Sequence, residues 1–292
     1  MAGAEDASPS EPATSSWRVA VIDRFYEPVI DDQQEQERQR VLYGLLDLDN
    51  DELPEPYYHG DLVQMIASHP SFIFLRYPIR DSSQPLKAIL TQLARIKTGF
   101  ARFPVDALIL SWESSTLISA FEKPLKRENV KHYKALIREW GHSHSVWYYS
   151  RQIIHNIEWL TERGVRVFTI AGNGGSGMVN TFSFASGVIT VGASEPELSH
   201  FIANNVFVDH FANAVYEPIR VDNNQGQPRG YDLNNDACID IPVNRLSSYY
   251  SSDVQLSRKP WPILKGSSFA APAAMKASFI KHSQICQSDD SA

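Results

Sequence analysis

The sequence predicts an α/β fold with a mostly parallel central sheet and helices on both of its faces. Five short apolar runs recur along the chain, and segments with helical spacing of apolar residues lie between them. Buried parallel strands are nearly continuous apolar runs, and strands that alternate with helices form parallel sheets. A length of 292 residues with 43% hydrophobic residues is enough for one large domain with its own core.

The first strand is expected to begin at Trp17, because W-R-V-A-V-I-D is almost continuously apolar. Residues 1–16 are small, polar and acidic, so we expect a disordered N-terminal tail there. The main domain is expected to span 17–284, followed by a C-terminal tail at 285–292. The later strands are expected at 71–77, 106–111, 165–171 and 188–193, with a weaker sixth at 238–242.

Helical spacing of apolar residues predicts helices at 84–99 and 147–162, and an amphipathic helix that begins at His59. Two segments interrupt this pattern and are expected to be surface excursions. Residues 28–56 are acidic and rich in glutamine, with a helix expected at 33–46. Residues 195–236 are rich in Asn, Asp and Gly.

The composition excludes several classes of partner. The net charge is -7 and no stripe of Lys and Arg occurs, which argues against a nucleic-acid partner. No apolar run approaches the roughly 18 residues of a membrane span. The N-terminus lacks the basic and apolar parts of a secretory signal, so we expect a cytoplasmic protein, or one exported without such a leader or trimmed of it. Cys238 and Cys286 are expected to be two free thiols, with a disulfide as the alternative.

Four residues with complementary chemistry lie at the ends of the expected strands and helices. Asp23 ends the first strand, His59 begins a helix in H-G-D-L-V-Q-M-I, Asn173 lies in A-G-N-G-G, and Ser268 lies in G-S-S-F-A-A-P at the head of a helical stretch. Acyl transfer needs a nucleophile, a base, a carboxylate that orients the base, and donors for the oxyanion. In parallel sheets such groups gather at the carboxyl ends of the strands.

The order Asp, His, Asn, Ser, each within its motif, resembles the subtilisin-like serine proteases over Trp17 to His282. The resemblance implies the three-layer fold of that family, a triad of Asp23, His59 and Ser268, and Asn173 in the oxyanion hole. L-I-L-S-W at 108–112 looks like the strand edge that pairs with bound peptide. By this resemblance Ser111, Trp112 and Glu113 are expected to bind substrate.

The chain departs from the family pattern mildly at Ser267, where threonine is usual, and more strongly at three other places. Arg24 and Phe25 follow the aspartate where small residues are usual, and Asp61-Leu62 follows His-Gly where Thr-His is usual. Glu113 replaces the glycine of the usual Ser-Leu-Gly, which predicts a preference for basic substrate residues or a narrowed cleft. We therefore expect a serine endopeptidase of narrow specificity.

Unrestrained proteolysis in the cytoplasm would harm the cell, so we also expect a partner protein that regulates the activity. Residues 195–236 are the candidate segment for this regulation. The alternative is a catalytically silent relative that binds peptides or proteins. An esterase is less compatible with the sequence, because no G-x-S-x-G surrounds Ser268.

Each residue also has a simpler interpretation when taken alone. Asp23 is compatible with a strand-end turn, His59 with a helix end, Asn173 with a left-handed turn and Ser268 with an N-cap. Their joint order favours the catalytic interpretation.

No metal site and no cofactor for catalysis are expected. His142 and His144, two residues apart and without an assigned carboxylate partner, are a weak metal signal. D-L-D-N-D-E at 47–52 lacks the glycine and final glutamate of an EF-hand. The resemblance allows structural calcium, but the sequence places no site for it.

Overall fold

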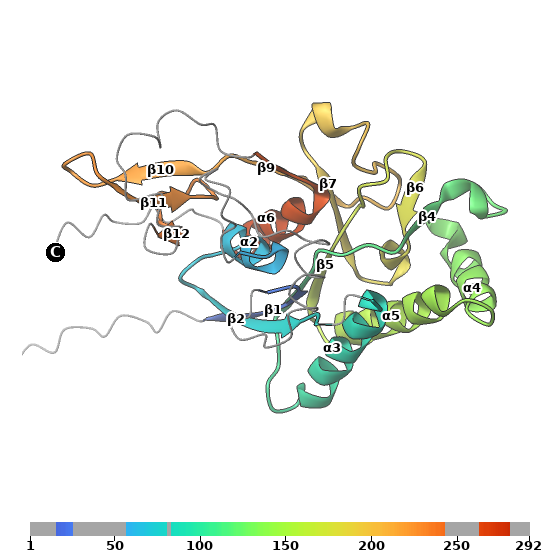
Figure 1. Ribbon diagram of the computed structural model, residues 1–292. Helices are drawn as coiled ribbons and strands as arrows, with labels where there is room; N and C mark the ends of the chain where they lie inside the picture. The colour runs from blue at the N-terminus through green and yellow to red at the C-terminus, as the bar shows by residue number, and fades with distance from the viewer. Residues whose placement is uncertain (1–15, 26–56, 81–82, 243–262, 281–292) are drawn as a thin grey trace, which may run out of the picture.

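The computed structural model describes residues 16–25, 57–80, 83–242 and 263–280 (Figure 1). Its centre is a six-stranded sheet in the order β2-β1-β3-β5-β7-β8, and every pairing in it is parallel. The predicted parallel sheet is therefore confirmed, and all five main predicted strands belong to it. Its strands are β1 (Trp17–Asp23), β2 (Phe72–Pro78), β3 (Ala107–Leu110), β5 (Arg166–Ile170), β7 (Ile189–Ala193) and β8 (His210–Ala212).

Helices cover both faces of this sheet, as expected (Figure 1). Alternate residues of β1 point to opposite faces, so Ala20 and Ile22 join one core while Val19 and Val21 join the other. The first core includes α3, α4 and α5, and the second includes α2 and α6. The bounds are α2 (His59–Ile66), α3 (Pro85–Gly99), α4 (Val130–Trp140), α5 (Ser145–Thr161) and α6 (Ser267–Phe279).

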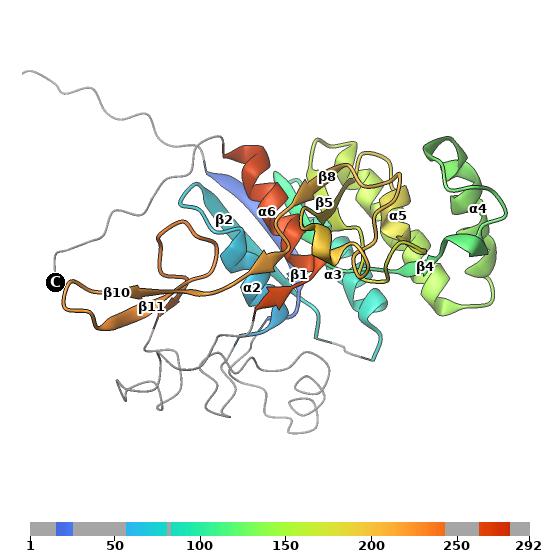
Figure 2. The same cartoon turned by 90° about the horizontal axis from the view of Figure 1, so that it is seen from above.

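The helices at 84–99 and 147–162 are confirmed as α3 and α5, with ends that agree to within two residues. Helix α4 was not foreseen. Its Tyr133 and Ile137 are fully buried in the core that it shares with α3 and α5. Seen from above, α6 lies over the sheet beside α2, which it contacts (Figure 2).

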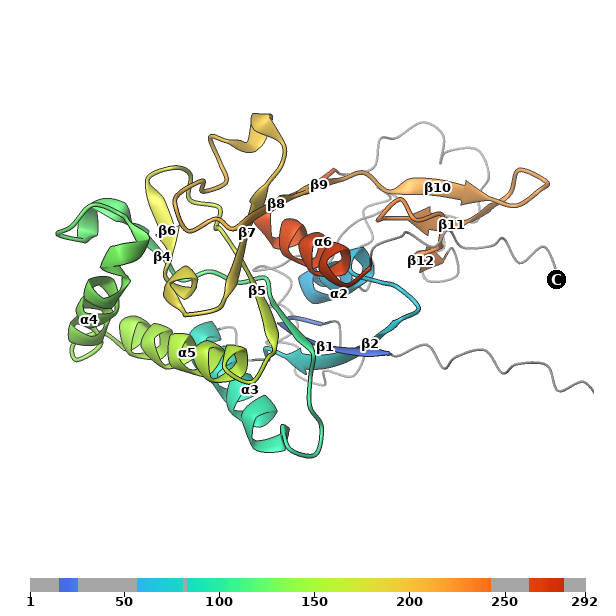
Figure 3. The ribbon, with the colours of Figure 1, turned by 180° about the vertical axis from the view of Figure 1, so that it is seen from behind.

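The prediction of a sixth strand at 238–242 is wrong in its placement. Ile241–Pro242 (β12) pairs antiparallel with β11 (Pro228–Asp232) in a separate sheet. The other edge of β11 pairs antiparallel with β10 (Ile219–Asp222). Figure 3 shows this small sheet at the opposite end of the molecule from α4. The sixth strand of the main sheet is β8, inside the expected excursion at 195–236. This strand has only three residues, His-Phe-Ala, so it does not stand out in the sequence as an apolar run. Its Phe211 is half-exposed.

Two further pairs complete the described strands. β4 (Ser115–Leu117) pairs with β6 (Met178–Asn180), and β9 (Val215–Tyr216) pairs with β13 (Leu264–Lys265). The helix expected at 33–46, the acidic turn at 47–52, the tail at 285–292 and nearly all of the tail at 1–16 lie outside the described residues.

The expectation of two free thiols is wrong for Cys238, which is disulfide-bonded. The only other cysteine of the chain, Cys286, lies outside the described residues. Within the described part of the chain, no helix has both the length and the apolar character needed to span a membrane.

The Asp232–Asp240 loop links the C-terminal ends of α2 and α6. The amide of Asn234 donates to the carbonyl of Met65 in α2 at 2.9 Å. Asp236 pairs with Lys276 of α6 at 3.1 Å. Through these two contacts the loop bridges α2 and α6. Helix α2 begins with His59 and α6 contains Ser268, so the loop connects the two helices that carry these residues.

One carboxyl group makes this loop sensitive to pH. Burial, and then the neighbouring Asp236 and Asp232, raise the pKa of Asp240 to about 7, although hydrogen bonds from Leu233 N and from Ser68 oppose the rise. Near pH 4–7 the folded chain therefore binds more protons than the unfolded chain. Stability should fall as the pH rises through this window, by a few kcal/mol at most.

The Asp240→Asn variant is expected to lose this part of the pH dependence and to be more stable than the parent above pH 7. Chemical denaturation at pH 5, 6, 7 and 8 measures it. The exposed Glu197 supplies a control, because Glu197→Gln should leave the pH profile of the parent in place. A profile that is the same in the Asp240→Asn variant and the parent would contradict the assignment.

Candidate active site

The candidate residues of three neighbouring strands meet at one edge of the sheet. Asp23 is the last residue of β1, Ser111 follows β3, and Asn173 follows β5 by three residues. These strands are adjacent in the order β1-β3-β5 and run parallel, so their carboxyl ends lie together.

Asp23 and His59 form a direct pair. Nδ1 of His59 lies 2.9 Å from both carboxylate oxygens of Asp23, which is completely buried. The backbone N–H of Arg24 donates to the same carboxylate at 2.7 Å. This contact assigns the Nδ1 proton to the bond with Asp23, which leaves Nε2 with its lone pair. The His59 side chain is 24% exposed, so the ring remains reachable from outside.

Gly60 allows the helix to start this close to β1. Its N–H donates to the carbonyl of Arg24 at 2.7 Å, and a Cβ at Gly60 would lie 2.5 Å from that carbonyl oxygen. Asp61, which replaces a usual threonine, has a structural role. Its carboxylate accepts a hydrogen bond from Tyr58 N at 3.0 Å and pairs with Arg76 at 3.0 Å. These contacts stabilise the first turn of α2 and thereby the position of His59.

Asp23 also favours the protonated form of His59. Burial is the largest single effect and lowers the pKa of His59, but the charge of Asp23 and its hydrogen bond together raise that pKa above 6.5. The charge of Arg24 acts in the opposite direction. Arg24 is itself buried, and its guanidinium carbon lies 5.9 Å from the centre of the Trp112 ring.

Ser268 is the second residue of α6 and is largely buried. The side-chain oxygen of Asn173 accepts hydrogen bonds from the N–H and the hydroxyl of Ser267, at 3.0 and 2.8 Å. This fixes which end of the Asn173 amide faces α6 and leaves its Nδ2 group directed away from Ser267. The hydroxyl of Ser111 donates to the carbonyl of Ser268 at 2.9 Å.

Three polar atoms converge on one small space beside Gly266. A Cβ at Gly266 would lie 3.8 Å from Ser268 Oγ, 3.9 Å from Ser268 N and 4.0 Å from Asn173 Nδ2. Among the described residues, these are the nearest atoms to that point apart from those of Gly266 and the residues on either side of it. A hydroxyl group and two N–H groups therefore border the same space, where all three could approach one bound carbonyl group.

Glu113 faces the Asn173 turn. Its Oε2 accepts hydrogen bonds from Asn173 N at 3.1 Å and from Ser115 Oγ at 2.6 Å. Gly172 has a φ of 105°, and a Cβ there would lie 2.3 Å from the same carboxylate oxygen. A side chain at Gly172 would therefore displace Glu113, in addition to the strain of that backbone conformation. The contact links the loop after β3 to the loop after β5.

Asn180 is a residue of the site that sequence reasoning missed. It is fully buried, and its amide nitrogen donates to the carbonyls of Ile170 at 2.8 Å and Trp112 at 3.3 Å. Its side-chain oxygen accepts from Ser114 N at 3.1 Å. Asn180 thus joins the two loops that carry the substrate-binding candidates and Asn173. No local motif marks this role, because its partners in the loop after β3, Ser114 and Trp112, lie 66 and 68 residues away in the sequence.

The structure brings the candidates together in two groups. One group is Asp23 with His59, and the other is Ser268 with Asn173, Ser111 and Glu113. The His59 ring lies 5.6 Å from the ring of Phe269, the residue next to Ser268. Among the described residues, no hydrogen bond joins His59 to the Ser268 hydroxyl. Such bonds are often long without substrate and tighten when it binds.

No residues are assigned to a metal or cofactor. In the described ranges, no group of three or more His, Cys, Asp or Glu side chains is placed to hold a metal ion. His142 and His144 lie in and after the turn between α4 and α5.

Comparison with known proteins gave matches among solved structures alone; no family model and no curated protein matches. The chain is similar to the prenylagaramide maturation protease PagA, with 14% identity, a TM-score of 0.45, and coverage of 90% of this chain and 73% of that one. It is similar to a lanthipeptide protease, with 17% identity, a TM-score of 0.42 and coverage of 91% and 74%.

It is also similar to the MycP3 protease from the type VII (ESX-3) secretion system, with 14% identity, a TM-score of 0.45 and coverage of 91% and 71%. All three are named as proteases. Likeness at this level carries no argument about activity, so the function proposed below rests on the contacts within this chain.

Proposed function

We propose that this protein is a serine endopeptidase that hydrolyses peptide bonds through an acyl-enzyme, with Asp23, His59 and Ser268 as its triad. The observation that carries the proposal is the convergence of Ser268 Oγ, Ser268 N and Asn173 Nδ2 on one space. The Asp23–His59 pair at the adjacent strand end supplies an oriented base. The resemblance of the four motifs to subtilisin-like serine proteases supports the same assignment.

The chemistry follows from these roles. Ser268 Oγ attacks the scissile carbonyl while His59 Nε2 takes its proton. The carbonyl oxygen becomes an oxyanion between Ser268 N and Asn173 Nδ2. His59 then protonates the leaving amine, and water hydrolyses the acyl-enzyme by the same steps in the second half of the reaction. Asp23 holds the imidazole in the required tautomer and stabilises the imidazolium ion.

A peptide substrate is proposed to lie extended beside Ser111–Glu113 and to add as a strand. The side chains of Ser111 and Glu113 are hydrogen-bonded within the protein. This leaves the backbone of the segment and the half-buried Trp112 as the groups through which substrate contact is proposed. Substrate specificity is proposed to be narrow, because Trp112 and Glu113 stand where subtilisin-like proteases usually have the smaller leucine and glycine.

A fluorophosphonate probe tests the function directly, since it reacts with serine hydroxyl groups that a neighbouring base activates. The probe is expected to label the parent protein at Ser268, as located by mass spectrometry, and to leave the Ser268→Ala variant unlabelled. A folded parent protein that is not labelled would contradict the proposal. It would favour the second candidate, a silent peptide-binding module, for which the missing His59–Ser268 hydrogen bond is the supporting observation.

Glu113 gives a second test, because the structure and the sequence suggest different roles for it. If it positions the Asn173 turn, Glu113→Gln should retain most activity, since its amide oxygen still accepts from Asn173 N. Glu113→Ala should lower kcat by about tenfold to a hundredfold with little change in KM, somewhat less than the loss of an oxyanion donor. Ser115→Ala is the control, because it removes the other hydrogen bond to the same carboxylate.

A peptide library distinguishes this from direct substrate recognition. If Glu113 bound basic substrate residues, neutralisation to Gln would change which sequences are cleaved. An unchanged cleavage profile in Glu113→Gln and Glu113→Gly would exclude that role, and a changed profile would exclude a purely positioning role.

A further inference from the structure

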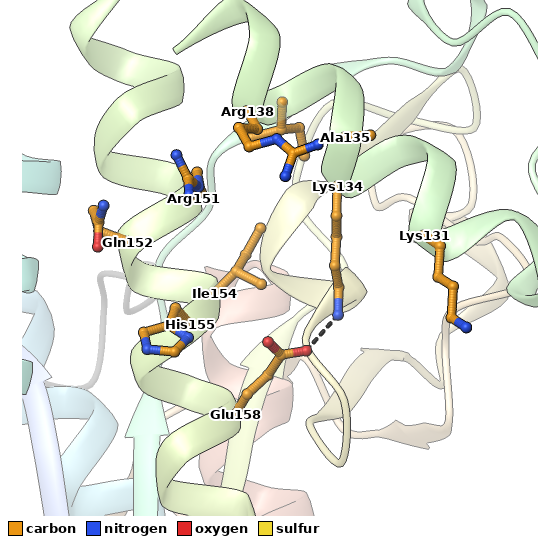
Figure 4. Close-up of a pocket in the computed structure, with 10 residues that line it drawn as sticks. Lys131, Lys134, Ala135, Arg138, Arg151, Gln152, Ile154, His155 and Glu158 are labelled. Atoms are coloured by element: carbon orange, nitrogen blue, oxygen red, sulfur yellow. Dashed lines mark hydrogen bonds and ion pairs between the residues drawn. The ribbon is translucent and has the colours of Figure 1, made fainter. Parts of the chain in front are cut away.

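A groove of about 490 Å³ lies between α4 and α5, on the face of the sheet opposite α2 and α6 (Figure 4). The ionisable side chains that line it are Lys131, Lys134 and Arg138 of α4, and Arg151, His155 and Glu158 of α5. Spacings of three and four residues place each set on one face of its helix. With His155 neutral, four positive charges and one negative charge line this groove, in a chain whose net charge is -7.

Glu158 is the one acidic residue among the described residues that line the groove, and it is already engaged. Glu158 forms an ion pair with Lys134 and accepts a hydrogen bond from Ser186 N at 3.0 Å. Burial is the largest single effect and raises the pKa of Glu158, but the hydrogen bonds from Lys134 and Ser186 outweigh it and hold that pKa below its ordinary value. Glu158 therefore stays ionised and compensates Lys134 alone.

Three cations of the groove remain uncompensated. Lys131, Arg138 and Arg151 form no ion pair and no hydrogen bond through their side chains with any of the described residues. Figure 4 shows Arg138 and Arg151 projecting from neighbouring helices at the same end of the groove. Like charges at such positions repel each other, and an anion bound between them would replace that repulsion with attraction.

The shape of the groove favours an extended ligand. Lys131 and Arg138 are seven residues apart, which is about 10 Å along a helix. This is the length of about three residues of extended peptide, whose successive side chains point to opposite sides. Consecutive carboxylates of such a peptide would thus point alternately toward α4 and α5. The apolar Ala135 and Ile154 also line the groove. A lone phosphate is bound better by donors that converge on one point.

We infer that the α4–α5 groove is a docking site for a carboxylate-rich peptide segment. The groove is separate from Ser268 and Asn173, and the inference does not depend on the proposed peptidase activity.

Binding of a hexaglutamate peptide with an uncharged fluorophore tests this inference by fluorescence anisotropy at low ionic strength. The full chain with Ser268→Ala is used, so that the peptide stays intact. The double change Arg138→Glu/Arg151→Glu is expected to weaken binding at least about tenfold. Lys87→Glu/Arg229→Glu makes the same change in net charge at two exposed positions outside the groove and should have little effect.

A thermal unfolding curve for each protein confirms that it is folded, and Arg138→Gln/Arg151→Gln serves if the charge reversal disturbs folding. Equal weakening by the groove pair and the control pair would overturn the inference, because it would show attraction to net charge alone. Absence of hexaglutamate binding would also overturn the inference. Tripolyphosphate is tested in parallel, and binding of tripolyphosphate without binding of hexaglutamate would count as the same negative result.

Discussion

Replacing Ser268 with alanine is expected to lower kcat for peptide hydrolysis by about a millionfold, the cost of removing the nucleophile from a triad that acts as a unit. Among the described residues, the Ser268 hydroxyl has no hydrogen-bond partner, so its removal should barely change stability. Turnover of a fluorogenic peptide, together with thermal unfolding of the same samples, measures both effects. The combination of lost activity and unchanged stability is what a nucleophile, and not a structural serine, should show.

The neighbouring Ser267 is the matched control. Its hydroxyl donates to the Asn173 side chain at 2.8 Å, so Ser267→Ala should weaken the orientation of one oxyanion donor but leave the nucleophile. The expected loss in kcat is no larger than that from removal of a whole donor, about a hundredfold to a thousandfold. If Ser267→Ala abolished activity and Ser268→Ala did not, the nucleophile would have been assigned to the wrong serine.

The change Asp23→Asn is expected to lower kcat by about 10⁴-fold, because asparagine can donate to Nδ1 and so favour the wrong imidazole tautomer. The side chains have nearly the same shape, so the fold should persist. Asp106→Asn is the control, since Asp106 also accepts a hydrogen bond from the backbone, from Arg18 N at 2.7 Å, but does not contact His59. Equal losses in the two variants would show that Asp23 acts through stability and not through catalysis.

The pH profile provides an independent readout for Asp23. Hydrolysis requires neutral His59, so kcat/KM should rise with pH as this residue loses its proton. Because Asp23 raises the pKa of His59, the midpoint in the parent protein should lie above 6.5. In Asp23→Asn the residual activity should have a lower midpoint, since burial then lowers the pKa without an opposing charge. A midpoint that does not move would contradict this electrostatic role.

Local sequence patterns were enough to predict the strand and the helices that carry the candidate catalytic residues. The first strand and its terminal Asp23 follow from an apolar run that any parallel-sheet core would bury. The helices at His59 and Ser268 follow from motifs whose residues are neighbours in the chain. The six-stranded sheet then confirms that these strand ends lie side by side.

The contacts that hold the site in place could not be predicted in the same way. Glu113 and Asn173 are 60 residues apart, and Asn180 meets Trp112 across 68 residues. Such contacts depend on β3 lying next to β5, which no single segment encodes. The sequence motif predicts that Glu113 meets substrate, and it gives no sign that the Glu113 carboxylate also accepts a hydrogen bond from Asn173 N.

The sequence by itself determined the α/β class, the positions of five main strands along the chain and the identity of the four catalytic candidates, because apolar runs and short motifs are local properties. Only the tertiary structure decided that β8 and not β12 completes the main sheet, and that α4 lies beside α5 with uncompensated cations between them. It also decided that Glu113 contacts Asn173 and that Asn180 joins the segments after β3 and β5. Each of these depends on which segments become neighbours in space, and that choice is made by packing of the whole core.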